Sequence, residues 1–190
     1  MGTVGTSGLL PKWVMSEFRS TEPRRQRRTT TVDSPVGLLT LVATDEGLCE
    51  LSWNGDRNDG KESLAHGAVQ DAGHPVLVQA VRELDEYFAG QRTEFTLPLA
   101  PSGTDFQQSA WKVLCGIPFG ETISYGEQAR RLGNPNAVRA VGGANGRNPI
   151  GIIVPCHRVI GADGSLTGFG GGMDVKRTLL DHERKVTASA

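Results

Sequence analysis

The Pro101-Ser102-Gly103 segment divides the sequence into two regions with different patterns, and this division limits most strongly how the chain can fold. Strand-like runs dominate before it, whereas helical spacing of apolar residues dominates after it. The charge changes too, because residues 33–103 carry four Lys and Arg against twelve Asp and Glu, and residues 104–190 carry ten against seven. Such a change at a Pro- and Gly-containing segment is typical of a joint, so we expect two domains, at 29–100 and 104–186.

The first region predicts a small antiparallel sheet with one helix. Apolar runs at 38–43 and 48–53 flank the turn sequence Asp45-Glu46-Gly47, which indicates a hairpin. From Pro75 onwards the apolar residues recur at helical spacing and stop before Gly90, which indicates a helix. The other predicted elements are a strand and turn at 32–37, a loop at 54–73 and a strand at 95–99 that returns to the sheet.

Residues 1–28 mix Gly, Ser, Thr, Pro and Arg without periodicity, which predicts a disordered leader. The basic cluster at 24–28 is interpreted as part of this tail rather than as a nucleic-acid-binding arm. The three cysteines form no disulfide framework. No apolar stretch approaches the roughly 20 residues that cross a bilayer, and the N-terminus lacks the apolar core of a secretion signal. We therefore expect a cytoplasmic protein without a membrane partner.

The second region predicts helices, two of which form a helix-turn-helix candidate. Ser124 is placed to cap a helix over 125–132 and, after a Gly-containing turn, Asn136 is placed to cap a helix over 137–145. Two such helices are typical of DNA-binding modules, although many pairs of this kind only pack. The small residues at 142–144 favour DNA binding, because they let the second helix approach another surface closely. Further helices are predicted after Thr104 and from Asp174 to Arg184.

The tetrapeptide Pro155-Cys156-His157-Arg158 holds the strongest candidate for chemistry. It follows the apolar run 150–154, which predicts a strand that delivers the cysteine. A free thiol has a pKa near roughly 8.5, so a base or a positive charge must help to ionise it at neutral pH. His157 can supply the base and Arg158 part of the positive field. The alternative, favoured if this pair is taken alone, is that Cys156 is a small buried hydrophobe.

Other segments extend the pattern around this tetrapeptide. They are Asp33-Ser34-Pro35-Val36-Gly37, Ile123-Ser124-Tyr125, the segment 137–144, Asn148-Pro149, the segment 153–159 and Leu179-Leu180-Asp181-His182-Glu183. In order and spacing they resemble the O6-alkylguanine-DNA alkyltransferases of the bacterial type, the methylated-DNA–protein-cysteine methyltransferases. The resemblance covers about residues 29–185 and is strongest in the second region.

The resemblance implies an α/β (α+β) protein, in which an RNase H-like antiparallel sheet domain precedes a mostly helical, winged-helix-like domain. It implies DNA repair by irreversible transfer of an alkyl group from O6 of guanine to Cys156, once per molecule, while O4 of thymine and the range of adduct sizes stay open. The implied partner is double-stranded DNA with O6-alkylguanine, bound in the minor groove with the damaged base flipped out. No cofactor is expected, and we expect a monomer, with cooperativity on DNA left open.

The resemblance also assigns roles to individual residues. Cys156 would take the alkyl group, His157 would deprotonate it through a water, and Glu183 would orient His157. Asn148 would brace the reactive loop, and Tyr125 would hydrogen-bond the flipped base and lend a proton to the leaving guanine. The residues that would contact DNA are Ser124, Tyr125, Arg139, Ala140 and Gly142, and Arg139 would fill the gap that the flipped base leaves in the stack. The substrate pocket would include Asn148, Val159, Phe169 and Gly170.

Two departures from the family pattern bear on these assignments. Some members hold a structural zinc through Cys and His in the first domain, where this chain offers only Cys49, His66 and His74, so we expect no metal. Phe169 stands where relatives often carry Tyr, which leaves the backbone amide of Gly170 as the candidate donor to O6.

Three other functions fit parts of the pattern. A non-catalytic DNA-binding relative would lack the acceptor thiol, so the presence of Cys156 argues against it. A cysteine hydrolase with a Cys-His-Glu triad would rarely place Cys and His side by side in sequence, and would give the helix-turn-helix no purpose. A transcription regulator would need a sensor or effector domain, which the sequence does not show.

Overall fold

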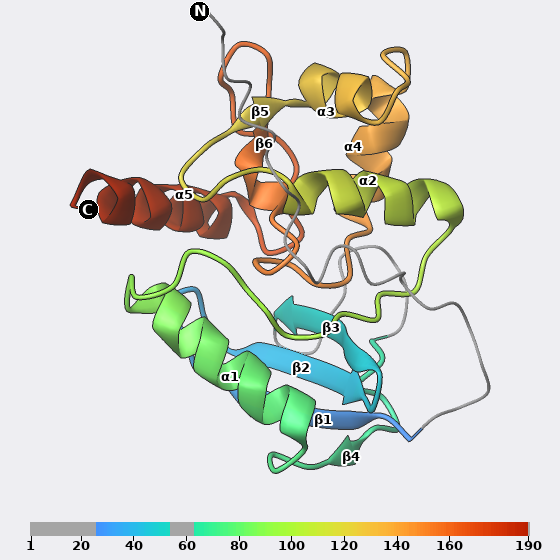
Figure 1. Ribbon diagram of the computed structural model, residues 1–190, viewed down its shortest axis with the longest axis vertical. Coiled ribbons are helices and arrows are strands. Elements are labelled where there is room, and N and C mark those ends of the chain that lie inside the picture. The colour runs from blue at the N-terminus through green and yellow to red at the C-terminus, as the bar shows by residue number, and fades with distance from the viewer. Residues whose placement is uncertain (1–25, 54–62, 190) are drawn as a thin grey trace, which may run out of the picture.

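The computed structural model describes residues 26–53 and 63–189, which form a sheet domain and a helical domain (Figure 1). The two lie one above the other in Figure 1, and the chain crosses from α1 to α2 between them. This arrangement confirms the expected α/β class. The elements are β1 (Arg28–Val32), β2 (Leu39–Thr44), β3 (Gly47–Trp53), β4 (Val69–Gln70), α1 (Pro75–Phe88), α2 (Asp105–Cys115), β5 (Ile123–Ser124), α3 (Tyr125–Arg131), α4 (Val138–Gly146), the short 3₁₀ helix η2 (Cys156–Arg158), β6 (Val159–Ile160) and α5 (Met173–Ala188).

The sheet has the strand order β3-β2-β1-β4. Its first three strands are antiparallel, so the predicted hairpin between β2 and β3 is confirmed. The fourth strand, β4, pairs parallel to β1 through Arg28 with Val69 and Thr29 with Gln70. The sequence predicted only a loop there, because a strand this short carries no periodic signal. The sheet is therefore mixed rather than purely antiparallel, and residues 54–62 of the predicted loop lie outside the described residues.

The first strand begins inside the segment expected to be a disordered leader, residues 1–28. Arg28 is the first residue of β1. The carbonyl of Arg27 also accepts a hydrogen bond from Val69 N (2.9 Å), so the end of the basic cluster belongs to the sheet rather than to a tail. Residues 1–25 of the predicted leader lie outside the part of the chain that the structure describes.

One face of the sheet is covered by α1, at the position that the sequence predicted (Figure 1). Pro75 is its first residue, where a helix needs no N–H partner. The following segment, 95–99, forms no regular strand, because Pro98 has no N–H to extend a ladder. It makes one bridge to β3, in which Leu48 N donates to Pro98 O (2.9 Å) and Ala100 N donates to Leu48 O (2.8 Å).

The helix-turn-helix candidate is formed by α3 and α4. Ser124 caps α3 as predicted, since its Oγ accepts a hydrogen bond from Glu127 N (3.1 Å). The second helix begins later than predicted, with Ala137 rather than Asn136 at its cap and no side-chain cap bond. The reason is a turn in which Ala137 N donates to Asn134 O (3.0 Å), which holds Asn136 outside the helix.

A buried pair of amides fixes α3 against α4. Asn145 Nδ2 donates to Gln128 Oε1 (2.7 Å), and Gln128 Nε2 donates back to Asn145 Oδ1 (3.0 Å). Trp111 of α2 lies in the core, and its Nε1 donates to Ala144 O (2.9 Å). Buried polar groups that satisfy each other specify one packing arrangement, so the angle of α4 is set by these bonds.

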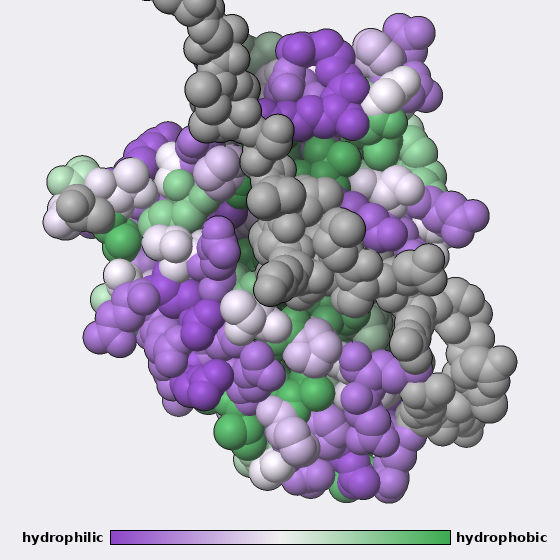
Figure 2. Space-filling view, viewed as in Figure 1, coloured by the Kyte–Doolittle hydropathy of each residue, from purple (hydrophilic) through white to green (hydrophobic). Residues whose placement is uncertain are grey.

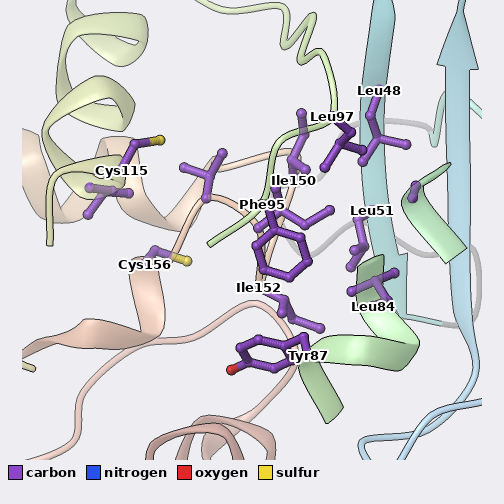
Figure 3. Close-up of a cluster of buried hydrophobic side chains, with 14 of the residues drawn as sticks. Leu48, Leu51, Leu84, Tyr87, Phe95, Leu97, Cys115, Ile150, Ile152 and Cys156 are labelled. Carbon is purple, nitrogen blue, oxygen red and sulfur yellow. The ribbon is translucent and has the colours of Figure 1, made fainter. Parts of the chain in front are cut away.

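One hydrophobic core extends through both domains. Figure 3 shows Phe95, Ile150 and Ile152 between Leu51 of β3 and Cys156. Burial of an aliphatic side chain stabilises a fold by roughly 1.5–3 kcal/mol, so several such contacts make the position of Cys156 depend on the sheet domain.

The surface that Figure 2 shows is mostly hydrophilic, with small separate hydrophobic areas. No helix among the described residues is long and apolar enough to cross a membrane. In the part of the chain that the structure describes, the exposed large hydrophobic side chains are Leu38, Val69, Val78, Phe106 and Val138.

Candidate functional site

The segment 150–154 that delivers the cysteine is a compact turn, not the predicted strand. Ile153 N donates to Gly151 O (2.8 Å) and Val154 N donates to Ile150 O (2.9 Å). Ile152 has a φ of 70°, a conformation that costs a β-branched residue about 1–2 kcal/mol. The whole segment is buried, and an apolar run that is buried all round has no alternation to distinguish a strand from a turn.

Cys156 is the first residue of η2, and its side chain is held by Asn148. The Asn148 amide donates to Cys156 Sγ (3.2 Å) and to Val154 O (2.7 Å), while its Oδ1 accepts from Ile150 N (3.1 Å). Only 8% of Cys156 is exposed. Burial raises the pKa of the thiol above its usual value, and the bond from Asn148 and the charge of Lys176 oppose this rise. The resting site therefore holds a protonated thiol, which needs the help of a base to ionise.

His157 is fully buried beside the cysteine in sequence, and one of its ring nitrogens is occupied. Its Nε2 lies 2.8 Å from Glu183 Oε1, whereas its Nδ1 has no hydrogen-bond partner among the described residues. Burial lowers the pKa of the imidazole, so the ring is neutral at neutral pH. Because a carboxylate only accepts, Nε2 carries the proton and Nδ1 keeps a free lone pair. The ring is thus arranged to accept one proton at Nδ1.

Glu183 collects donors from both domains. It accepts from Tyr87 OH (2.9 Å) of α1, from Gly120 N (2.9 Å) and from Nε and Nη2 of Arg158 (both 3.0 Å). Burial alone would raise the pKa of this carboxyl, but the hydrogen bond from His157 and the charge and hydrogen bonds of Arg158 hold it well below its usual range. The sequence placed Glu183 in the last turn of a helix ending near Arg184, but α5 continues to Ala188, so Glu183 stands inside the helix.

Arg158 has a different place from the one expected. Its guanidinium pairs with Glu183 and donates to Ile117 O (2.6 Å), so its charge is already compensated. The cation that lowers the pKa of Cys156 is Lys176, which is fully buried in α5. Lys176 Nζ donates to Val159 O (2.7 Å) and to Thr167 O (2.8 Å), which joins β6 to the loop before α5.

Sequence reasoning missed Lys176, although a signal was present. Lys176 precedes Leu179, Leu180 and Glu183 by three, four and seven residues, which puts all four on one helix face. A lysine on an otherwise buried face must find partners for its charge, so it marks a specific site.

The loop over residues 167–172 lies beside the same cluster. Tyr125 OH donates to Thr167 O (3.2 Å), and the Phe169 ring meets the His157 ring edge-on at a centroid distance of 6.4 Å. Gly170 is exposed in this loop. Val159 is buried in β6, which pairs parallel to β5, the strand just before Tyr125. The loop therefore connects the start of α3 to His157.

The residues assigned to DNA contact lie at the start of α3 and on α4, Ser124 being the last residue of β5 and the cap of α3. Arg139 and Ala140 are exposed, while Ser124 and Gly142 are half-buried. A Cβ added at Gly142 would stand 3.9 Å from the Tyr125 ring, so these two residues are neighbours. The structure thus groups Cys156, His157, Glu183 and Asn148 in one buried cluster, with Tyr125 between that cluster and the exposed face of α4.

Cys49, Cys115, His66 and His74 have no part in the contacts of this cluster described above. Cys49 and Cys115 are buried, and burial raises the pKa of Cys115 to about 12. His74 precedes α1, and His66 is exposed. Among the described residues, no group of three or more His, Cys, Asp and Glu side chains is arranged to hold a metal ion.

Two family models match this chain. Residues 28–101 match the 6-O-methylguanine DNA methyltransferase, ribonuclease-like domain, and residues 105–185 match the 6-O-methylguanine DNA methyltransferase, DNA binding domain. A methylated-DNA--protein-cysteine methyltransferase of Methanosarcina barkeri is 48% identical over 152 residues, which covers 80% of this chain and 94% of that protein. A protein of the same name from Mycobacterium bovis is 52% identical over 154 residues, covering 81% and 90%.

A solved structure resembles the fold just described. The crystal structure of Mycobacterium tuberculosis OGT in complex with DNA matches with a TM-score of 0.75 and 49% identity, covering 84% of this chain and 93% of that one. Because both family models and these relatives span nearly all of the described residues, the chain belongs to the 6-O-methylguanine DNA methyltransferase family.

Proposed function

We propose that this protein repairs DNA by transferring an alkyl group from O6 of guanine to its own Cys156, irreversibly and once per molecule. One observation carries the proposal: Cys156 receives an N–H from Asn148 (3.2 Å), and the adjacent His157 has a free Nδ1 while Glu183 holds its Nε2 (2.8 Å). Relatives called methylated-DNA--protein-cysteine methyltransferases support this activity. The matched DNA binding domain and the DNA complex of the M. tuberculosis protein support DNA as the substrate.

The reaction starts with the removal of a proton, because burial keeps the resting Cys156 protonated. His157 accepts this proton at Nδ1, through a water, and Glu183 balances the charge of the imidazolium. The Asn148 N–H and the charge of Lys176 stabilise the thiolate that forms. The sulfur then attacks the alkyl carbon, so that an S–C bond forms while the C–O6 bond breaks and its electrons pass to guanine.

The leaving guanine needs a proton, and we assign its supply to Tyr125. Its hydroxyl is held at the loop carbonyl of Thr167 (3.2 Å), beside the acceptor cluster. The proton that His157 has taken then restores the tyrosine. The product is a thioether, which has no easy leaving step, so Cys156 is used only once.

The substrate base must leave the duplex to reach a thiol of which only 8% is exposed. Extrusion of a base costs about a few kcal/mol, and less for a damaged base that pairs badly. Arg139 and Ala140 on the exposed face of α4 would enter the minor groove, Arg139 filling the gap left in the stack. Monomeric binding and the domain limits, 29–100 and 104–186, are part of the same proposal.

A duplex with a single O6-methylguanine tests the function directly. After incubation with the protein, mass mapping is expected to find one added methyl group, on the peptide that contains Cys156, and one repaired guanine for each protein molecule. A repaired base together with unmodified Cys156 would refute the acceptor. Turnover beyond one base per molecule would refute the irreversible step.

Arg139→Ala is expected to slow repair in duplex DNA by about tenfold or more, because the extruded base then leaves an unfilled gap. Transfer from the free alkylated base should change much less. Single-turnover rates on both substrates measure the difference, and Arg177→Ala, which removes an exposed arginine of α5, is the control. Equal losses on the two substrates would contradict the proposed role.

Lys176→Met is expected to slow transfer at neutral pH by about tenfold, because loss of this charge raises the pKa of Cys156 further. The loss should shrink as the pH rises, since hydroxide then ionises the thiol without help from a cation. A pH–rate profile shifted to higher pH is the expected result. The control is Lys185→Met, which removes an exposed lysine of the same helix and should not shift the pH–rate profile. An unshifted profile for Lys176→Met would contradict the electrostatic role.

A further inference from the structure

Trp53, the last residue of β3, reaches from the sheet domain to two segments of the acceptor site. A Cβ added at Gly151 would stand 2.9 Å from both Cζ3 and Cη2 of the indole. A Cβ added at Gly171 would stand 2.8 Å from Cε2 and 3.0 Å from Cδ2 and Cζ2. Because Cε2 is bonded to both of the other two atoms, these nearly equal distances place Gly171 against the face of the ring. The indole therefore contacts the turn before Cys156 and the loop that follows it.

The two glycines are needed because of the ring, not because of their backbone conformation. Several other described glycines have a positive φ, among them Gly164, Gly168 and Gly172 near the site, but Gly151 and Gly171 do not. An L-residue could adopt their backbone angles, yet its Cβ would collide with the indole. Both segments are thus packed on Trp53 as closely as a main chain allows.

Trp53 is itself held in place. Its Nε1 donates to Val36 O (3.2 Å) in the turn after β1. Its ring meets Phe169 edge-on at a centroid distance of 5.5 Å, and Phe169 in turn meets His157 at 6.4 Å. The start of the loop is fixed separately, by the bonds of Tyr125 and Lys176 to Thr167 O. The position of residues 169–171 consequently depends on the indole.

We propose that Trp53 determines which alkyl groups the site accepts, because it sets the separation between the turn 150–154 and the loop 167–172. The inference rests on the proposed function and adds to it a residue of the sheet domain that determines specificity. Trp53 would act through the two segments packed on it rather than by touching the thiol or the substrate. The proposal implies that an alkyl group larger than methyl displaces the loop or the turn, and both are packed on a ring that cannot move without losing its hydrogen bond to Val36. Small alkyl groups are therefore favoured.

The test compares two duplexes, one with O6-methylguanine and one with O6-benzylguanine. Trp53→Ala is expected to raise the ratio of the benzyl to the methyl transfer rate by about tenfold or more, in the range that pocket fit commonly gives. Trp53→Phe, which keeps an aromatic ring, should raise it less. Gly73→Ala is the control, a substitution in the sheet domain away from Trp53. The added Cβ would meet only the Asp71 side chain, at 3.5 Å, so the ratio of benzyl to methyl transfer should stay unchanged.

A double substitution tests the contact itself. Gly171→Ala alone is expected to slow methyl transfer by about tenfold, because the added Cβ pushes the loop off the ring. In the Trp53→Ala background the same Cβ has room, so Gly171→Ala should then have little effect. Equal losses on both duplexes for Trp53→Ala, together with no rescue of Gly171→Ala, would overturn the inference and leave Trp53 as ordinary packing between the domains.

A chemical probe separates this inference from the proposed function. Iodoacetamide and N-benzyl iodoacetamide both alkylate thiols. Mass mapping of the Cys156 peptide gives the ratio of the two alkylation rates, N-benzyl iodoacetamide over iodoacetamide, without any DNA. Trp53→Ala should also raise this ratio, because the larger reagent gains more from a wider site. If the wild-type protein transfers nothing from either duplex while this ratio rises, the proposed function fails and the spacing role stands. An unchanged ratio in the variant would overturn the spacing role on its own.

Discussion

Cys156→Ser is expected to abolish alkyl transfer while DNA binding persists. A serine hydroxyl is far less acidic than a thiol and is a poorer nucleophile toward carbon, so the neutral His157 cannot generate an effective attacking group. The Asn148 amide can still donate to the oxygen, so the local structure should survive. The measurement is methyl transfer from an O6-methylguanine duplex over hours, with the dissociation constant for the same duplex measured by fluorescence anisotropy.

The other cysteines provide matched controls for this variant. Cys49 and Cys115 are buried free thiols, and burial raises the pKa of both. Cys115 shares the hydrophobic core with Cys156, as Figure 3 shows, but within residues 26–53 and 63–189 its thiol has no hydrogen bond to a basic side chain. Cys115→Ser and Cys49→Ser should therefore transfer one methyl group per molecule, as the wild type does. A Cys156→Ser protein that still becomes methylated on either thiol would disprove the assignment of the acceptor.

The parts of the fold that the sequence predicted are those with a local signal. The β2–β3 hairpin has a turn sequence between two apolar runs, and α1 has an apolar stripe that ends at a glycine. Ser124 caps α3 because its side chain and the helical pattern agree. In each case the residues that decide the structure are close together in the chain.

The parts that failed depend on contacts between distant residues. The run 150–154 is apolar at nearly every position because it is buried from all sides, so its turn could not be distinguished from a strand. Tyr87 donates to Glu183 across 96 positions of sequence, which no periodicity can reveal. The Gly151 and Gly171 contacts with Trp53 are of the same kind. The motif around Cys156 named the reacting groups, whereas the groups that tune them are visible only in three dimensions.

Glu183→Gln is expected to cost both stability and activity. The carboxylate accepts from His157, Arg158, Tyr87 and Gly120 N, and an amide can accept only at its single oxygen. The buried guanidinium of Arg158 would lose its counter-charge, and loss of one partner of a buried ion pair destabilises a protein by about 3–5 kcal/mol. The free energy of unfolding in urea measures this loss.

The control is Glu86→Gln, which removes another carboxylate that is paired with an arginine. Glu86 of α1 lies near the surface and pairs with Arg92 (2.6 Å). An ion pair at the surface is screened by water, so its loss should change stability far less. Transfer should stay at the wild-type rate in this variant.

Activity should fall by about 100-fold or more in Glu183→Gln, because the imidazolium loses the negative charge that balances it, and His157 must compete with Arg158 and Tyr87 for the one remaining acceptor oxygen. The difference in unfolding free energy between the wild type and Glu183→Gln should decrease as the pH falls. The pKa of Glu183 is lowered in the folded protein, so its contribution is complete above the ordinary carboxyl pKa of about 4.3 and declines as the pH falls below that value. The gap in unfolding free energy between the wild type and Glu183→Gln should therefore narrow as the pH falls below about 4.3. A gap that stayed unchanged into strong acid would contradict the lowered pKa of Glu183.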